Sequence, residues 1–207
     1  MAKRLNVAPT KSVLLALRHQ ESFLTQGHTL LERKKELLTR LVYQRLHHYR
    51  KLRGEARVAL RDAYTWLGIT TMRMNRRTLR QINLALKPAI RVEIVARRSL
   101  GVEYPSVNAE QLPLQPVGLM GTDPSLDETR IRMARAAVVL ARLGEAETAL
   151  WRLLEEQRKT QKRVNALKYN IIPRYRETIR YIQSSLEEEE RDTLFQVKRL
   201  RERSHSP

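Results

Sequence analysis

The stretch that decides the fold is Val139–Ile171, which reads VLARLGEAETALWRLLEEQRKTQKRVNALKYNI. Its apolar residues recur at alternating steps of four and three, with two polar residues near the centre. A spacing that averages 3.5 residues keeps one stripe of a helix facing a partner helix only when the two helices supercoil. The pattern therefore predicts one strand of a coiled coil. The stripe consists of Val139, Leu143, Ala146, Leu150, Leu153, Gln157, Thr160, Val164, Leu167 and Ile171.

Beyond Ile171 the stripe continues, but successive steps of four displace it by one residue, which favours local unwinding of the supercoil. Pro173 stands in the same place, and a proline inside a helix costs ~3 kcal/mol because it removes a backbone hydrogen bond. Since the apolar period resumes at once, we expect a helix that kinks near Pro173 and continues. The later members of the stripe are Tyr175, Ile179, Ile182 and Leu186, followed by Leu194 and Val197.

The N-terminal part of the chain supplies a second stripe at multiples of seven residues, which Arg45 interrupts. A parallel series starts where the first weakens. Because one chain supplies both helices, the natural arrangement is a mainly α fold with a long two-stranded antiparallel coiled coil. The first series is Leu17, Leu24, Leu31, Leu38, Leu52, Ala59 and Trp66, and the second is Val42, Tyr49, Ala56 and Ala63.

Proline and glycine divide the chain into three parts, because five of the eight prolines lie between Pro88 and Pro124. We expect an N-terminal helix over 1–87, a small central insert over 88–124 and a C-terminal helix over 125–207.

Within the insert, the alternation in 91–97 predicts a short strand. Residues 102–104 would pair with it across 98–101, Pro105 would end the hairpin, and 112–120 would form a loop. Ser125, with Glu128 three residues later, predicts the N-cap of the C-terminal helix.

The composition limits the function. The chain has 207 residues, a formal charge of +18 and no cysteine, so a disulfide framework and a thiolate metal site are excluded. No uncharged apolar run approaches the ~20 residues that span a bilayer. The net charge is +13 over residues 1–80, zero over 81–124 and +5 over 125–207. Basic ends of this kind favour polyanionic partners, either nucleic acid or acidic protein surfaces.

No catalytic site emerges from the sequence, which contains neither of the glycine-rich phosphate-binding motifs. His47 and His48 are adjacent and point to different parts of a helix surface, and the four carboxylates of 187–190 fan around a helix axis. We therefore expect no catalytic residue, no metal site and no cofactor.

Nucleic-acid binding is the main alternative that the residues themselves leave open, together with a general scaffold role. Phosphate affinity would follow from dense cationic charge, but no helix-turn-helix, zinc finger or basic-region zipper accompanies it. Two basic clusters carry this interpretation, namely Arg73, Arg76, Arg77 and Arg80, and Arg158, Lys159, Lys162 and Arg163.

Specific strings then indicate a family. Val7–Lys11 and Gly27–Leu38 resemble the opening of the D subunit of V/A-type rotary ATPases, where a Pro-Thr-Lys/Arg motif precedes a leucine- and lysine-rich helix. Residues 160–173, TQKRVNALKYNIIP, are similar to the late signature of that family, and matching strings follow over 178–199. Lys168 departs from the pattern, which usually has glutamate there, so a salt bridge of that glutamate is not expected here.

This resemblance implies a non-catalytic rotor shaft in the central stalk of a V/A-type ATPase, transmitting torque between the nucleotide-binding hexamer and the ion-translocating membrane ring. The implied partners are that hexamer, the small F subunit of the stalk and a funnel-shaped subunit on the ring. The location would be cytoplasmic and peripheral to the membrane, with no membrane span and no specific nucleic acid. The polar stripe members Gln157 and Thr160 would fix the register of the two helices.

The resemblance also suggests which residues contact partners. We expect the antiparallel helices to bring basic residues of both chain ends together, within the hexamer, including Lys3, Arg4, Lys11 and Arg191 through Arg203. The candidate partner-binding residues are Lys11, Arg163, Asn165, Pro173, Arg174, Arg191, Lys198 and Arg199.

Overall fold

The computed structural model describes residues 4–117 and 122–204, and it divides into two compact units that we describe one at a time. Unit 1 comprises Met1–Leu37 and Arg158–Pro207, and unit 2 comprises Leu38–Gln157. Two long helices, α1 (Lys11–Arg73) and α3 (Pro124–Ala166), contribute residues to both units.

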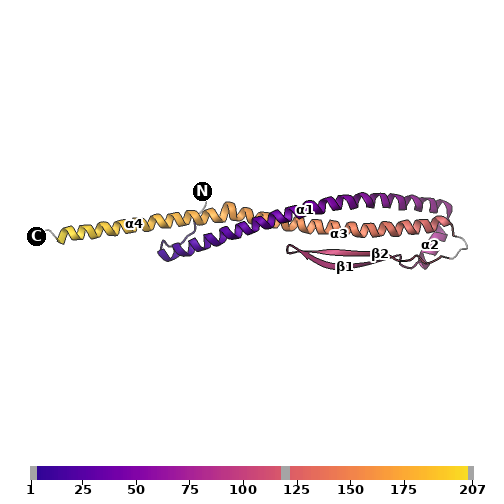
Figure 1. Ribbon diagram of the computed structural model, residues 1–207, viewed down its shortest axis with the longest axis horizontal. Helices are drawn as coiled ribbons and strands as arrows, with labels where there is room; N and C mark the ends of the chain where they lie inside the picture. Colours follow the sequence, from indigo (N-terminus) through magenta and orange to yellow (C-terminus); the bar gives the residue numbers. More distant parts are fainter. Residues whose placement is uncertain (1–3, 118–121, 205–207) are drawn as a thin grey trace. The chain divides into compact units, whose positions relative to one another are not determined.

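In unit 2, α1 and α3 run antiparallel (Figure 1), because contacts further along α1 meet residues earlier on α3. Gln157 Nε2 donates to Thr39 Oγ1 at 3.0 Å, so this polar stripe residue bonds across the helix pair as expected. Further along, Arg132 of α3 pairs with Asp62 of α1. Such ties at separate points resist sliding of one helix along the other.

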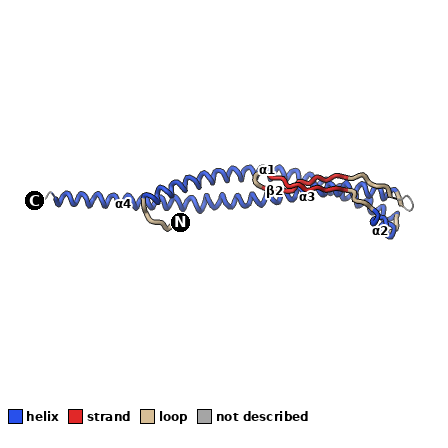
Figure 2. The backbone as a smooth tube through the Cα atoms, turned by 90° about the horizontal axis from the view of Figure 1, so that it is seen from below, coloured by secondary structure: helices blue, strands red, loops and turns tan. Residues whose placement is uncertain are grey.

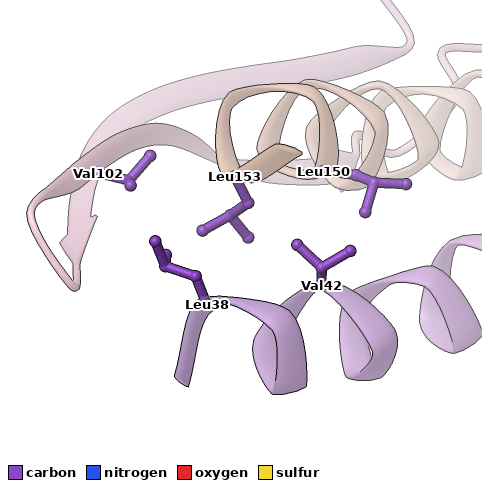
Figure 3. Packing of buried hydrophobic residues seen from close by; sticks show 5 residues of the cluster. All are labelled: Leu38, Val42, Val102, Leu150 and Leu153. Atoms are coloured by element: carbon purple, nitrogen blue, oxygen red, sulfur yellow. The ribbon is translucent and has the colours of Figure 1, made fainter. Parts of the chain in front are cut away.

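The core of unit 2 joins three elements. Leu38 and Leu153 are fully buried, and they pack with Leu150 and Val42 in the stripe that the heptad spacing predicts. Val102 enters the same cluster from the hairpin, as Figure 3 shows. Apolar burial of this kind contributes about 1.5–3 kcal/mol for each large side chain, so the cluster holds the hairpin as well as the helix pair.

The helix expected over 1–87 is interrupted in the structure. α1 ends at Arg73, and α2 (Arg76–Ala85) begins after a break at Met74 and Asn75. Asn75 has extended backbone, and its Oδ1 accepts a hydrogen bond from Arg77 N at 3.2 Å. An asparagine that satisfies a free N–H in this way is a strong helix start, which the apolar pattern alone does not reveal.

The hairpin consists of β1 (Ile90–Ser99) and β2 (Val102–Gln111), and both strands are longer than predicted (Figure 2). Leu100 and Gly101 form a two-residue turn with φ of 51° and 79°. Positive φ at both positions is typical of the turn whose twist matches a hairpin, and Gly101 adopts it without strain.

The prediction that Pro105 ends the hairpin is wrong. Pro105 lies inside β2, paired with Ala96. Alternate residues of an antiparallel strand direct their N–H away from the partner strand, so a proline at such a position removes no hydrogen bond of the hairpin.

The hairpin lies along α3, and β2 makes the contacts (Figure 1). Val107 N donates to Glu145 Oε2 at 2.9 Å, and Arg152 Nη1 donates to Glu103 O at 2.8 Å. Tyr104 is buried, and its hydroxyl accepts from Arg45 Nη2 at 3.1 Å. This bond explains why Arg45 interrupts the leucine series of α1, because its side chain binds Tyr104 of the hairpin.

The cap of α3 is Asp123, and the prediction of Ser125 as the N-cap is wrong. Asp123 Oδ1 accepts from Ser125 N at 2.8 Å, and Leu126 N donates to Asp123 O at 2.9 Å. Pro124 occupies the first helical position, where its missing N–H is not needed. Ser125 is therefore already inside the helix, and it is buried.

In unit 1, the first part of α1 packs against α4 (Ile172–Ser204). Leu17, Ile179 and Ile182 form the buried cluster, with half-buried apolar residues around it. Arg176 Nε lies 2.8 Å from Glu21 Oε1, which again joins the two helices. The neighbours that complete the cluster are Leu5, Val13, Leu14, Tyr175 and Leu186.

A π-helical turn, η1 (Leu167–Ile171), accounts for the displaced stripe. It lies directly before Pro173, and its closing bond runs from Ile172 N to Leu167 O. A π-turn holds one residue more than an α-helical turn, which is the displacement that the sequence shows. The extra residue lets both parts of the stripe face α1 without unwinding a longer stretch. The kink expected near Pro173 stays a prediction.

The predicted fold class is confirmed: the chain is mainly α, with long N- and C-terminal helices and a two-stranded antiparallel sheet between them. Leu194 and Val197 are exceptions to the stripe, because 71% and 43% of their surface is exposed. The predicted coiled-coil core residues are all buried or half-buried, namely Leu24, Leu31, Leu38, Leu143, Leu150, Leu153, Val164, Leu167 and Ile171.

Candidate interaction surfaces

A charged network on unit 2 centres on Arg132 of α3. Its guanidinium bonds Asp62 of α1, lies 3.2 Å from Glu128 Oε2 and sits 5.1 Å from the ring centroid of Trp66. The hydrogen bond to Asp62, followed by that to Glu128, raises the pKa of Arg132. The carboxylates of this network neutralise the charge of Arg132. An open groove of about 720 Å³ lies beside it and is lined in part by Val58 and Arg135.

A basic cluster covers the junction of α1 and α2 in unit 2. Arg73 Nη1 lies 3.5 Å from Asp123 Oδ1. Hydrogen bonds from Ser125, followed by the charge of Arg73, hold the pKa of Asp123 below its usual range. Arg76, Arg77 and Arg80 are exposed around this pair. The four arginines of the sequence pattern are thus exposed near the junction of α1 and α2, which suits an acidic partner.

In unit 1, the start of α1 is joined to α4 by an exposed ion pair. Lys11 Nζ lies 2.7 Å from Glu190 Oε1. The hydrogen bond and the charge of Lys11 lower the pKa of Glu190, and Glu190 raises the pKa of Lys11 by the same means. Lys11, a predicted partner-binding residue, therefore already has an internal partner.

The expected gathering of basic residues from both chain ends is wrong for Arg4. The segment before α1 turns back along α4: Leu5 N donates to Thr178 Oγ1 at 3.1 Å, and the Arg4 guanidinium lies 4.6 Å from the ring centroid of Tyr181. These contacts hold Arg4 away from the last turns of α4. Lys3 and the side chain of Arg203 lie outside the described residues.

The last turns of α4 extend past the start of α1 (Figures 1 and 2). Residues 187–201 are all exposed. Leu194, Phe195 and Leu200 expose 71%, 58% and 66% of their surface. Several large apolar side chains exposed on one helical segment are typical of a protein contact. Arg191, Lys198 and Arg199 lie among these residues, and the Arg199 guanidinium sits 5.0 Å from the ring centroid of Phe195.

The other predicted partner-binding residues lie apart from this end. Arg163 and Asn165 are exposed, and Asn165 Oδ1 accepts from Gln161 Nε2 at 2.8 Å. Pro173 and Arg174 are half-buried beyond the π-turn. The structure therefore distributes the eight candidates along α1, α3 and α4 instead of forming one site, and their contacts with partners stay a prediction.

Sequence reasoning missed the Arg132 network and a buried polar cluster that joins α1 to α3. Thr70 Oγ1 and Thr129 Oγ1 form a hydrogen bond of 2.7 Å in which either hydroxyl can donate, and both oxygens lie 2.9 Å from Ser125 O. The only signal in the sequence was three hydroxyl residues, Thr70 near the end of the first predicted helix and Ser125 and Thr129 near the start of the second. Since threonine is common on helix surfaces, that signal is weak.

The described residues show neither a metal cluster nor a membrane span. Among them, no three His, Cys, Asp or Glu side chains are grouped so as to hold a metal ion. In this same part of the chain, no helix combines the length and the hydropathy needed to cross a membrane.

An antiparallel pair of long helices, with a hairpin between them in the sequence, defines a two-stranded coiled-coil protein. The family model for the D subunit of ATP synthase matches residues 13–202, and the chain belongs to this family. It is thus a stalk subunit of a membrane-associated, multi-subunit ATPase complex, and not the catalytic subunit.

Individual relatives agree over almost the full length. The V-type ATP synthase D subunit of Thermotoga neapolitana is 34% identical over 96% of this chain and 98% of its own. The A-type ATP synthase D subunits of Thermococcus sibiricus and Thermococcus gammatolerans are 32% and 33% identical, each over 97% of this chain and 96% of their own.

Proposed function

We propose that this chain is the rotor shaft in the central stalk of a V/A-type rotary ATPase. It transmits torque between a hexamer that hydrolyses or synthesises ATP and a membrane ring that moves ions. The observation that carries the proposal is the match to the family of ATP synthase D subunits over residues 13–202, which includes both members of the helix pair. The proposed partners are the hexamer, the small F subunit of the stalk and the funnel-shaped subunit on the ring.

The contacts between the helices support a mechanical role. A shaft that transmits torque must resist sliding and separation of its two helices. In unit 2, the bond from Gln157 to Thr39 and the pairing of Arg132 with Asp62 oppose sliding at separate points. In unit 1, the pairing of Arg176 with Glu21 does the same. Polar contacts inside a coiled coil commonly fix its register.

A cross-linking experiment tests rotation inside the hexamer. The chain has no cysteine, so Gln196→Cys on the exposed end of α4 would introduce its only thiol. Paired with a single cysteine on the inner surface of one hexamer subunit, it should form a disulfide. ATP turnover should stop on oxidation and return on reduction. The matched control is Gln196→Cys with a hexamer that lacks the second cysteine.

Two outcomes distinguish the alternatives. If turnover stops only in the doubly substituted, oxidised complex, the chain must move relative to the hexamer during catalysis. If the disulfide forms in full and both turnover and ion pumping continue unchanged, the chain is not the rotor.

A further inference from the structure

The two edges of the hairpin differ in their hydrogen bonding. In an antiparallel pair, residues alternate between those that direct both backbone groups at the partner strand and those that direct both outward. Three contacts show which residues direct their backbone groups inward and which direct them outward. Val107 N bonds Glu145 and Glu103 O bonds Arg152, both outside the hairpin, whereas Leu112 N bonds Ala89 O across the two strands. Together with the register, they identify the outward-facing residues of β1 as Ile90, Val92, Ile94, Ala96 and Arg98.

The β2 edge is closed to a further strand. The carbonyl of Glu103 accepts from Arg152, and the N–H of Val107 donates to Glu145. Pro105 lies between them and has no N–H. A strand that approached this edge would meet two occupied groups and one missing donor, and α3 lies beside it.

The β1 edge is open. Residues 91–98 are all exposed. Within the described part of the chain, the outward-facing backbone groups of Val92, Ile94 and Ala96 have no hydrogen-bond partner. Ile94 and Val95 expose 70% and 59% of their surface. A long, apolar, unprotected edge strand is a template for another strand, and proteins that do not use such an edge usually blunt it.

We propose that β1 binds an extended segment of another subunit of the ATPase complex, which adds a third strand to the hairpin. Main-chain hydrogen bonds would supply affinity, and side chains at alternate positions would supply selectivity. The charge on β1 indicates the chemistry of that segment. Arg91 and Arg98 lie opposite Glu110 and Glu103 of β2, whereas Arg97 lies opposite Tyr104. The added strand should therefore carry an acidic residue beside Arg97, next to apolar ones that cover Ile94 and Val92.

This inference requires that the chain belongs to the ATPase complex, but it does not require that the chain rotates. Either proposal can therefore be refuted while the other holds. The occupant is taken to be another protein and not a second copy of this chain, because β1 presents three arginines. Two such strands side by side would bring like charges together, which is unfavourable.

The test uses the full chain and the purified other subunits of the same complex, presented one at a time in a binding assay. Ile94→Pro removes one outward N–H and places the proline ring at the open edge, while the hairpin loses no internal bond. The control Ile94→Thr keeps the N–H and the β-branched shape but removes apolar surface. We expect one subunit to bind, Ile94→Pro to weaken that binding by about tenfold or more, and Ile94→Thr to weaken it by less than about threefold.

Amide hydrogen exchange of the unaltered chain provides a second measurement. On binding, the outward amides of Val92, Ile94 and Ala96 should become protected, while the inward amides of Glu93 and Val95 should be protected both before and after. Such an alternation of newly protected and already protected amides is expected when a partner adds a strand to β1.

Three results would overturn the proposal. One is equal binding of every subunit by the parent and the Ile94→Pro variant. Another is an equal loss in Ile94→Pro and Ile94→Thr, which would indicate side-chain packing without a shared ladder. The third is self-association of the chain that Ile94→Pro abolishes, which would make a second copy the occupant of the edge.

Discussion

Replacing Leu153 by alanine tests the core that joins the helix pair to the hairpin. The side chain is fully buried among Leu38, Val42, Leu150 and Val102, as seen in Figure 3. Three carbon atoms are lost, which at ~0.8 kcal/mol per buried carbon removes about 2.5 kcal/mol of transfer free energy. The remaining cavity adds ~24 cal/mol per Å³. Because α1, α3 and β2 all line the site, it cannot close fully, and we expect a total loss of about 3.5 kcal/mol.

The assay is urea and thermal unfolding followed by circular dichroism. For a chain of this length, a loss of ~3.5 kcal/mol corresponds to a fall in Tm of about 10 °C. The amides of the hairpin should also exchange faster, because Val102 loses its neighbour in the core. The matched control is Leu140→Ala on the same helix, where 40% of the side chain is exposed, and it should cost less than ~1 kcal/mol.

The reasoning would be refuted by equal losses in the two variants. Such a result would mean that Leu153 is no better packed than a side chain on the helix surface. Unfolding of Leu153→Ala without faster exchange in the hairpin would refute a narrower point, namely that the cluster holds the hairpin to the helices.

Three further predictions concern the ends of the helices and the π-turn. Deleting Lys168 removes the extra residue of η1, so helix content and Tm should stay close to those of the parent chain. Deleting Lys162 instead turns Val164 out of the stripe and should lower Tm by several degrees, at about 2–4 °C per kcal/mol lost. Glu190→Gln should be less stable than the parent at pH 7 and low salt. Because the pKa of Glu190 is lowered in the folded chain, this difference in stability should disappear as the pH falls through that lowered value. Urea unfolding at pH 7 and pH 3 measures it. Removing residues 191–207 should leave the thermal unfolding of the remainder unchanged, since 191–201 are exposed. It should weaken binding to the hexamer by about tenfold or more, because the apolar side chains of Leu194, Phe195 and Leu200 are then missing from the contact; unchanged binding in a pull-down titration would contradict this.

The helix pair could be predicted from the sequence because its signal is periodic. From Val139 to Ile171, each stripe residue repeats the same geometric requirement, so one error in the pattern does little harm. The one-residue displacement was visible too, but not its cause. A π-turn and a local unwinding of the supercoil both absorb an extra residue, and only the backbone of η1 decides between them.

The interaction surfaces were harder to predict because each depends on a single tertiary contact. The charges of Arg4 and Lys11 place them in one basic group with the end of α4. In the structure, Arg4 lies against Tyr181 instead, whereas Lys11 pairs with Glu190, next to Arg191. The N-terminal segment turns back because Thr178 Oγ1 accepts from Leu5 N. No periodic pattern contains such a bond, since its partners are 173 residues apart.

The prolines show most clearly where a local rule needs the structure. Sequence rules treat proline as a breaker, yet three of these residues lie where the missing N–H does little harm. Pro124 occupies the first position of α3, and Pro105 faces the outer edge of β2. Pro173 follows a turn that already departs from α-helical bonding. The effect of a proline therefore depends on the direction in which its N–H would have pointed. In β2 that direction has a consequence for partners: because Pro105 closes one edge of the hairpin, any added strand must pair with β1.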